Sequence, residues 1–125
     1  ARSGGGEGAA LREEAAGDAK LVFQVLDGVD GKDLRVLADR QRDRVISGVI
    51  CLASTGGADK VTVLVAVSQD LAGRLHAGKL VGALMPLVGG RGGGRPDFAQ
   101  GGGSDPSGVA AVEAAFFEAA LKALA

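Results

Sequence analysis

Two arginines and a run of glycines between residues 89 and 103 are the clearest candidates for a binding site in this sequence. The stretch reads GGRGGGRPDFAQGGG, with Arg91 and Arg95 four residues apart. Arginine presents a planar guanidinium that can bind a phosphate through two hydrogen bonds. Glycine lacks a Cβ, so successive backbone N–H groups can point at phosphate oxygens and a partner can come close. The stretch therefore predicts a surface that binds an anionic ligand.

Positive charge is concentrated around this stretch. The chain contains 14 basic and 15 acidic residues, so its net charge of −1 does not by itself favour a polyanionic partner. Residues 71–96, however, contain no acidic residue and four basic ones, Arg74, Lys79, Arg91 and Arg95. A basic segment within a slightly acidic protein is typical of a surface that binds nucleic acid.

A flexible linker is the alternative interpretation of the glycine-rich stretch. Linkers are usually featureless runs of glycine and serine, whereas this stretch carries Pro96, Asp97 and Phe98 in fixed order. Phe98 is expected to anchor the stretch in the core, and Asp97 to cap a turn or hold one of the two arginines. The composition therefore favours a structured, ligand-facing loop over a linker.

Residues that could support catalysis or hold a metal are few. His76 is the single histidine and Cys51 the single cysteine, which excludes a thiolate metal site and a site built on two histidines. His76 is expected to be half-buried or on the surface. Cys51 is expected to be a buried, inert thiol, because apolar surroundings raise the pKa of a thiol. The phosphate-loop pattern GxxxxGK[ST] does not occur, and the one GxGxx[GA] match, at residues 4–9, follows no predicted strand.

The hydrophobic pattern predicts an α/β fold, a single compact domain with a mixed β-sheet flanked by helices. Near-continuous apolar runs predict buried strands at 20–26, 45–55 and 60–68, and such runs are typical of a sheet covered on both faces. Helical spacing predicts three helices. They are expected at 30–45, at 69–89 with a break at Gly78, and from Asp105-Pro106 to the end. Residues 89–103 are expected to form the loop before the last helix.

Two pairs of side chains on the predicted helices have simple structural interpretations. Arg40 and Arg44 alternate with Asp39 and Asp43, which is typical of a solvated helix face with internal ion pairs. Phe116 and Phe117 widen the apolar stripe of the last helix and are expected in the core.

Residues 1–18 predict a flexible lead-in, with one or two helical turns at 9–16. They lack the basic segment and apolar run of a secretory signal, and no stretch approaches the 18 apolar residues of a membrane helix. We expect no contact with a membrane, and the single cysteine fits a reducing, cytoplasmic setting. The first residue is not Met, so the chain is expected to be part of a larger protein.

Four quoted segments together resemble a known family, the DHHA1 domain, in the form found at the C-terminus of alanyl-tRNA synthetases. The segments are LRVLADRQRDRV, KVTVLVAVSQDL, HAGKLVGALMPLVGG and GGRGGGRPDFAQGGGSDP. The resemblance covers residues 19–125 and implies a DHHA1-like globular domain, preceded at 1–18 by the stub of an upstream helical subdomain. It also implies a non-catalytic module that contacts the outer corner of alanine-specific tRNA. Such a module supports aminoacylation and editing by the parent ligase.

The resemblance assigns expected roles to individual residues. Arg74, Lys79, Arg91 and Arg95 would neutralise phosphates, and Gln100 would bind a base or a 2′-hydroxyl. The three glycines between the arginines, Gly92, Gly93 and Gly94, would let the RNA come close to the protein backbone. No cofactor is expected in this chain, because the ATP-dependent core and the zinc editing site of such a parent lie upstream.

Two other functions stay open. One is the nucleotide- or single-strand-binding half of a DHH-family phosphodiesterase, although that branch usually carries a His in the glycine-rich motif where this sequence has Arg95-Pro96. The other is a protein-interaction domain that forms a weak homodimer through the last helix. Beside tRNA, the upstream domains of the parent chain are an expected partner.

Overall fold

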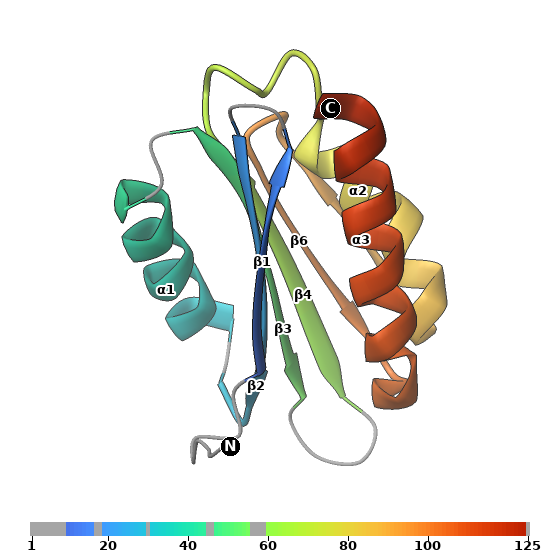
Figure 1. Ribbon diagram of the computed structural model, residues 1–125. Coiled ribbons are helices and arrows are strands. Elements are labelled where there is room, and N and C mark those ends of the chain that lie inside the picture. Colours follow the sequence, from blue (N-terminus) through green and yellow to red (C-terminus); the bar gives the residue numbers. More distant parts are fainter. Residues whose placement is uncertain (1–9, 17–18, 30, 45–46, 56–59, 125) are drawn as a thin grey trace.

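The computed structural model describes residues 10–16, 19–29, 31–44, 47–55 and 60–124. These residues form a six-stranded sheet with helices on both faces (Figure 1). The predicted α/β class, with a mixed sheet flanked by helices, is confirmed. The elements are β1 (Ala10–Ala16), β2 (Ala19–Asp27), α1 (Gly31–Arg44), β3 (Gly48–Thr55), β4 (Val61–Val67), α2 (Ala77–Leu84), the 3-10 helix η1 (Met85–Val88), β5 (Arg91–Gly94), β6 (Phe98–Gly103), the 3-10 helix η2 (Pro106–Gly108) and α3 (Val109–Leu124).

The strands lie in the order β1-β2-β3-β4-β6-β5. Only β2 and β3 pair in parallel among these neighbours, and a parallel pair needs a crossover connection. That connection is α1, which lies alone on one face of the sheet, while α2 and α3 lie on the other (Figure 1). The late hairpin β5–β6 forms one edge of the sheet and β1 forms the other.

Two apolar clusters hold the layers together. The larger lies between the sheet and α2 and α3, and the smaller lies under α1, with Leu34 and Ala38 facing Ile50 and Leu64. The central strands contribute to both clusters, which explains why their sequences are apolar on both faces. No helix among the described residues is long and apolar enough to cross a membrane.

Three phenylalanine rings form the centre of the larger cluster. Phe116 and Phe117 are 0% and 3% exposed, as predicted. Their ring centroids lie 5.1 Å apart in an edge-to-face arrangement, and Phe23 of β2 lies 6.0 Å from Phe116. Because both rings are used inside the domain, they offer no surface for the homodimer that the sequence left open.

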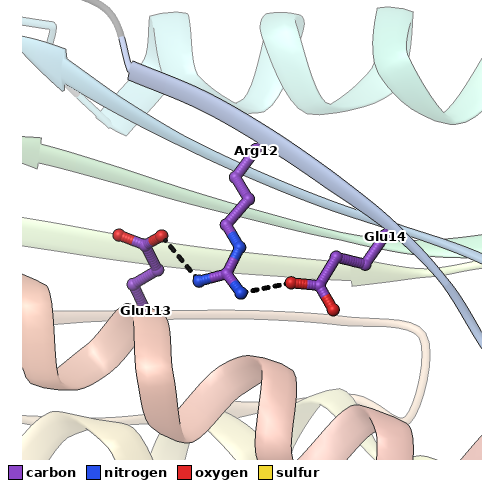
Figure 2. Close-up of polar contacts among 3 residues, drawn as sticks. All are labelled: Arg12, Glu14 and Glu113. Carbon is purple, nitrogen blue, oxygen red and sulfur yellow. Dashed lines mark hydrogen bonds and ion pairs between the residues drawn. The ribbon is translucent and has the colours of Figure 1, made fainter.

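The prediction of helical turns at 9–16 is wrong for residues 10–16, which form β1. Ala, Leu, Glu and Arg favour helices, but a segment this short does not form a stable helix on its own. Here each of its residues instead pairs with a residue of β2 in an antiparallel ladder. The Arg12 guanidinium lies 4.3 Å from the Phe117 ring centroid and donates to Glu113 Oε2 at 3.1 Å, beside Glu14 (Figure 2). Residues 1–9, 17 and 18 of the predicted lead-in lie outside the described residues.

The break before α2 falls earlier than predicted. Gly78 lies inside α2, and the helix begins after His76, whose Nδ1 accepts a hydrogen bond from Lys79 N at 3.2 Å. This contact satisfies one of the backbone N–H groups that a helix start leaves free. The helical stretch ends as predicted at Gly89, which has a left-handed φ of 65°.

Two glycines of α2 give opposite predictions for stability. A Cβ at Gly78 would lie 2.5 Å from Gly94 O, whereas a Cβ at Gly82 would have nothing within 4 Å. Gly78→Ala should therefore destabilise the domain by about 1–3 kcal/mol through overpacking. Gly82→Ala should stabilise it by about 0.4–1 kcal/mol, since it restricts the unfolded chain. Urea denaturation of both variants measures the difference, and equal effects would contradict the packing of α2 on β5.

Candidate nucleic-acid interface

The glycine-rich stretch is a β-hairpin rather than a loop or a linker. Strands β5 and β6 pair antiparallel, with Arg91 opposite Gly102 and Gly93 opposite Gln100. Glycine has a low intrinsic preference for strands, which is why the sequence pattern did not predict this pair. The hairpin forms because β6 adds to the edge of β4 and β5 then adds to β6.

The carbonyls of the hairpin turn accept hydrogen bonds from three elements, through the backbone of α2 and β4 and through a side chain of α1. Ala77 N and Gly78 N of α2 donate to Pro96 O at 2.8 Å and Arg95 O at 3.1 Å. Val67 N of β4 donates to Asp97 O at 2.8 Å. This carbonyl also accepts from Arg42 Nη1 of α1 at 3.4 Å. A turn bound at three successive carbonyls is part of the folded domain, so the linker interpretation is wrong.

The two faces of β5 have different roles, because successive side chains of a strand point to opposite faces. Gly92 and Gly94 face α2. A Cβ at Gly92 would lie 2.7 Å from Val81 Cγ1, and one at Gly94 would lie 2.7 Å from Ala99 Cα. Close packing within the domain therefore explains these two glycines, which the sequence assigned to a partner.

The other face of the hairpin brings together most of the remaining predicted site. Arg91, Gly93 and Arg95 alternate along β5 and its continuation, where Arg95 N donates to Phe98 O at 2.8 Å. Opposite them lie Phe98 and Gln100, whose partners on β4 belong to the cluster under α1. We call this surface the hairpin patch. It consists of Arg91, Gly93, Arg95, Phe98, Gln100 and Gly102.

The hairpin patch is open and positively charged. Arg91 and Arg95 are exposed, and neither has an acidic partner within ion-pair distance among the described residues. Asp97 uses its carbonyl, as described above, and no ion pair joins its carboxylate to either arginine in the part of the chain that the structure describes. A Cβ at Gly93 would have nothing within 4 Å. Both arginines are therefore available to an anionic ligand.

One flank of α1 borders the hairpin patch, which the sequence did not predict. The Arg35 guanidinium lies 5.2 Å from the centroid of the Phe98 ring, within cation–π distance. The Gln100 amide lies against Gly31, the first residue of α1. Arg35 and Arg42 are seven residues apart and so lie on one side of the helix. That spacing was the signal available in the sequence. Arg40, on the same helix, is exposed as expected.

Arg74 and Lys79 do not join the hairpin patch. They lie on the α2 side of the sheet, beside His76, at the rim of an open depression of about 680 Å³. Arg74 Nη2 donates to Leu124 O, in the last turn of α3, at 3.1 Å. The four basic residues that are close in sequence are thus divided between two surfaces.

The structure bears out the predicted placement of the two residues that could support catalysis. His76 is half-buried and caps α2, and Cys51 is 0% exposed at the centre of β3. Burial raises the pKa of the Cys51 thiol. No group of three or more potential metal ligands occurs among the described residues.

Burial of Cys51 predicts an unreactive thiol. Because its pKa is raised, the reactive thiolate is even scarcer at pH 8 than for an exposed cysteine. An aromatic disulfide reagent at pH 8 should leave the folded chain unmodified and should react with one equivalent once guanidinium chloride unfolds it. Rapid reaction of the folded chain would contradict the buried position.

The fold is that of an α/β domain whose mixed sheet ends in a glycine-rich hairpin packed on a helix. A family model of the DHHA1 domain matches residues 18–124. The structure is similar to the C-Ala domain from Aquifex aeolicus alanyl-tRNA synthetase, with a TM-score of 0.78, 32% identity, and coverage of 90% of this chain and 97% of that one. The chain therefore belongs to the DHHA1 domain family, in its C-Ala form.

Longer relatives are also similar over most of the chain. The alanine–tRNA ligase of Anaeromyxobacter dehalogenans is 48% identical over 120 residues, which is 96% of this chain and 13% of the relative. That of Magnetococcus marinus is 49% identical over 111 residues, 86% of this chain and 12% of the relative. The chain thus spans only about an eighth of these proteins. A solved DHH-domain protein, described as a member of a family of ribosomal proteins, shares the fold. Its TM-score is 0.61 at 20% identity, over 92% of this chain and 28% of that one.

Proposed function

We propose that this domain is the tRNA-binding accessory module of an alanine–tRNA ligase, and that the hairpin patch is its RNA-binding surface. The observation that carries the proposal is the placement of Arg91 and Arg95 on one open face, on either side of bare Gly93. Similarity to alanine–tRNA ligases and to a C-Ala domain supports tRNA as the polyanion. The parent would act in the cytoplasm, and its ATP and zinc sites would lie outside this chain.

The geometry of the hairpin patch suits a sugar–phosphate backbone. Residues four apart in a strand are about 13 Å apart. The long side chains of the two arginines can extend toward each other over Gly93 and bind phosphates on either side of a nucleotide that crosses it. No side chain at Gly93 keeps that nucleotide away from the peptide plane. Such contacts position an RNA without reading its sequence.

Recognition of bases would come from the α1 side of the hairpin patch. Gln100 can donate to and accept from a base edge or a 2′-hydroxyl, and the latter distinguishes RNA from DNA. The outer plane of the Arg35 guanidinium, which lies over Phe98, can stack on an unpaired base. Few phosphate contacts imply weak binding by the isolated domain, so the rest of the ligase would supply most of the affinity for tRNA.

Removal of the two arginines should weaken tRNA binding and reduce its salt dependence. Each phosphate contact contributes about 0.7–0.9 to the slope of log K against log salt concentration. Arg91→Ala with Arg95→Ala should therefore lower the magnitude of that slope by about 1.4–1.8. Titration of alanine-specific tRNA at several salt concentrations, by fluorescence anisotropy, measures both effects.

A matched control separates binding from net charge. Arg40→Ala with Lys20→Ala removes the same charge from exposed positions outside the hairpin patch and should leave the salt slope close to that of the original chain. Equal slopes for the two double variants would mean that the hairpin patch does not bind tRNA. That result would overturn the proposed function.

Gly93→Val should make the domain more stable and tRNA binding weaker. A Cβ at this position would have nothing within 4 Å. Valine also has a higher strand preference than glycine, which can stabilise the domain by up to about 1 kcal/mol. The same side chain would hold the nucleotide away from β5. The loss of about one hydrogen bond to the RNA would lower the tRNA affinity roughly fivefold. Gly82→Ala is the control, since it should stabilise without weakening binding. Thermal unfolding and anisotropy test both effects, and unchanged affinity of Gly93→Val would argue against close approach.

A further inference from the structure

The depression on the α2 side of the sheet lies at the opposite face from the hairpin patch. It has a volume of about 680 Å³ and is formed by the chain before α2, by α2 itself, by the hairpin turn at Pro96 and by α3 at Ala119. Volumes of about 300–1,000 Å³ are typical of sites that hold small organic groups. Its floor is mainly apolar, with Leu75 and Leu80 among the residues that form it.

The polar groups around the depression are donors or cations. His76 Nδ1 accepts from Lys79 N, so the neutral ring carries its proton on Nε2 and can donate from there. Arg74 uses Nη2 to bind Leu124 O, which leaves its other N–H groups for a ligand. Lys79 is exposed, and no acidic residue lines the depression.

The groups around the depression that can bind an anion are these side chains, and not the backbone N–H groups at the start of α2. The first backbone N–H groups of a helix often bind phosphate, but here three of them are already paired. Ala77 N and Gly78 N donate to the carbonyls of the hairpin turn, and Lys79 N donates to His76. A ligand must therefore combine an apolar flat surface with an anionic group that Lys79 and Arg74 can reach.

We propose that the depression binds one unstacked nucleotide of the bound RNA. The base lies on the apolar floor, its edge accepts from His76 Nε2, and its phosphate lies between Lys79 and Arg74. This inference rests on the proposed function, because a nucleotide of tRNA is the ligand that has a flat apolar ring, acceptor groups and negative charge together. Pro96 lines the depression and directly follows Arg95 of the hairpin patch, so one RNA strand can pass around the hairpin turn between the two surfaces.

The test fills the depression without changing charge. Ala83 is exposed and lines the depression, so Ala83→Trp should occupy the position of the base. Stacking of one base contributes about 1–3 kcal/mol, which corresponds to a loss of about 5-fold to 150-fold in tRNA affinity. The salt slope should stay unchanged. Ala114→Trp, at an exposed position of α3 outside the depression, is the control and should bind tRNA like the original chain.

A second variant keeps the helix cap while removing the ring. Asn is a favoured N-cap residue, so His76→Asn should fold as stably as the original chain and bind tRNA several-fold more weakly. Nuclear magnetic resonance provides an independent measurement. Millimolar adenosine or uridine monophosphate should shift the amide signals of residues 76–83, and Ala83→Trp should abolish these shifts.

The outcomes separate this inference from the proposed function. Equal tRNA affinity of Ala83→Trp and Ala114→Trp overturns the nucleotide site and leaves the hairpin patch intact, and so does the lack of any shift with the monophosphates. Loss of the arginine effect on the salt slope overturns the proposed function instead. A drop in affinity for Ala83→Trp and His76→Asn, with Ala114→Trp unchanged, supports the nucleotide site.

Discussion

The close contact that the helical stretch α2–η1 makes with the glycines of the β5–β6 hairpin is the constraint on which both candidate surfaces depend. A Cβ at Gly78 would lie 2.5 Å from Gly94 O, and a Cβ at Gly101 would lie 2.8 Å from Met85 Cγ. A protein interior has little room for such atoms to move apart. The glycines therefore allow the helical layer to approach the edge of the sheet and to hold a hairpin that has few side chains of its own.

This contact also joins the two ends of the basic segment. The carbonyls of Arg95 and Pro96 accept the first N–H groups of α2, so the hairpin turn and the start of the helix form one rigid unit. The Arg95 side chain then lies on the face toward α1, while Pro96 lines the depression on the face toward α3. A distortion of the turn would move both surfaces at once, because Arg95 belongs to one surface and its neighbour Pro96 to the other.

The strands and helices that bury apolar side chains could be predicted from the hydrophobic pattern of the sequence. The wrong predictions concern strands whose sequences carry no such pattern. The strands at β3 and β4 were evident because both faces are apolar and both are covered. The strand at β1 was not, since its residues favour helices and its conformation depends on pairing with β2 and on Arg12 over Phe117. The β5 strand consists of one arginine and three glycines, so only its neighbours in the sheet determine its conformation.

The candidate site was predicted in composition but not in geometry. The sequence identified Arg74, Lys79, Arg91 and Arg95 as a basic segment. The first two, however, lie on the face that α2 covers, whereas Arg91 and Arg95 lie on the other face. Sequence spacing cannot show that division, because it depends on which face α2 packs against. Arg35 was missed for a related reason: it reaches the hairpin only through the crossover that puts α1 over β3 and β4.

The glycines of the hairpin separate into two groups when each is considered with an added Cβ. At Gly92, Gly94, Gly101 and Gly103 that atom would meet backbone within 3 Å, so the fold itself requires glycine. At Gly93 it would meet nothing, and at Gly102 only Val61 O at 4.0 Å. Neither residue is among the glycines with positive φ, and both are exposed.

Stability alone would favour a different residue at Gly93 and Gly102. Glycine inside a strand loses conformational entropy and offers no side chain to pack, so a β-branched residue would strengthen the edge of the sheet. The two positions lie on the face that carries Arg91, Arg95 and Gln100, and among the described residues no atom lies closer than 4.0 Å to a Cβ at either position. The nucleotide of the proposed function, lying flat over the peptide planes with its phosphates at the arginines, would account for the missing side chains. It would also account for two arginines that have no acidic partner among the described residues.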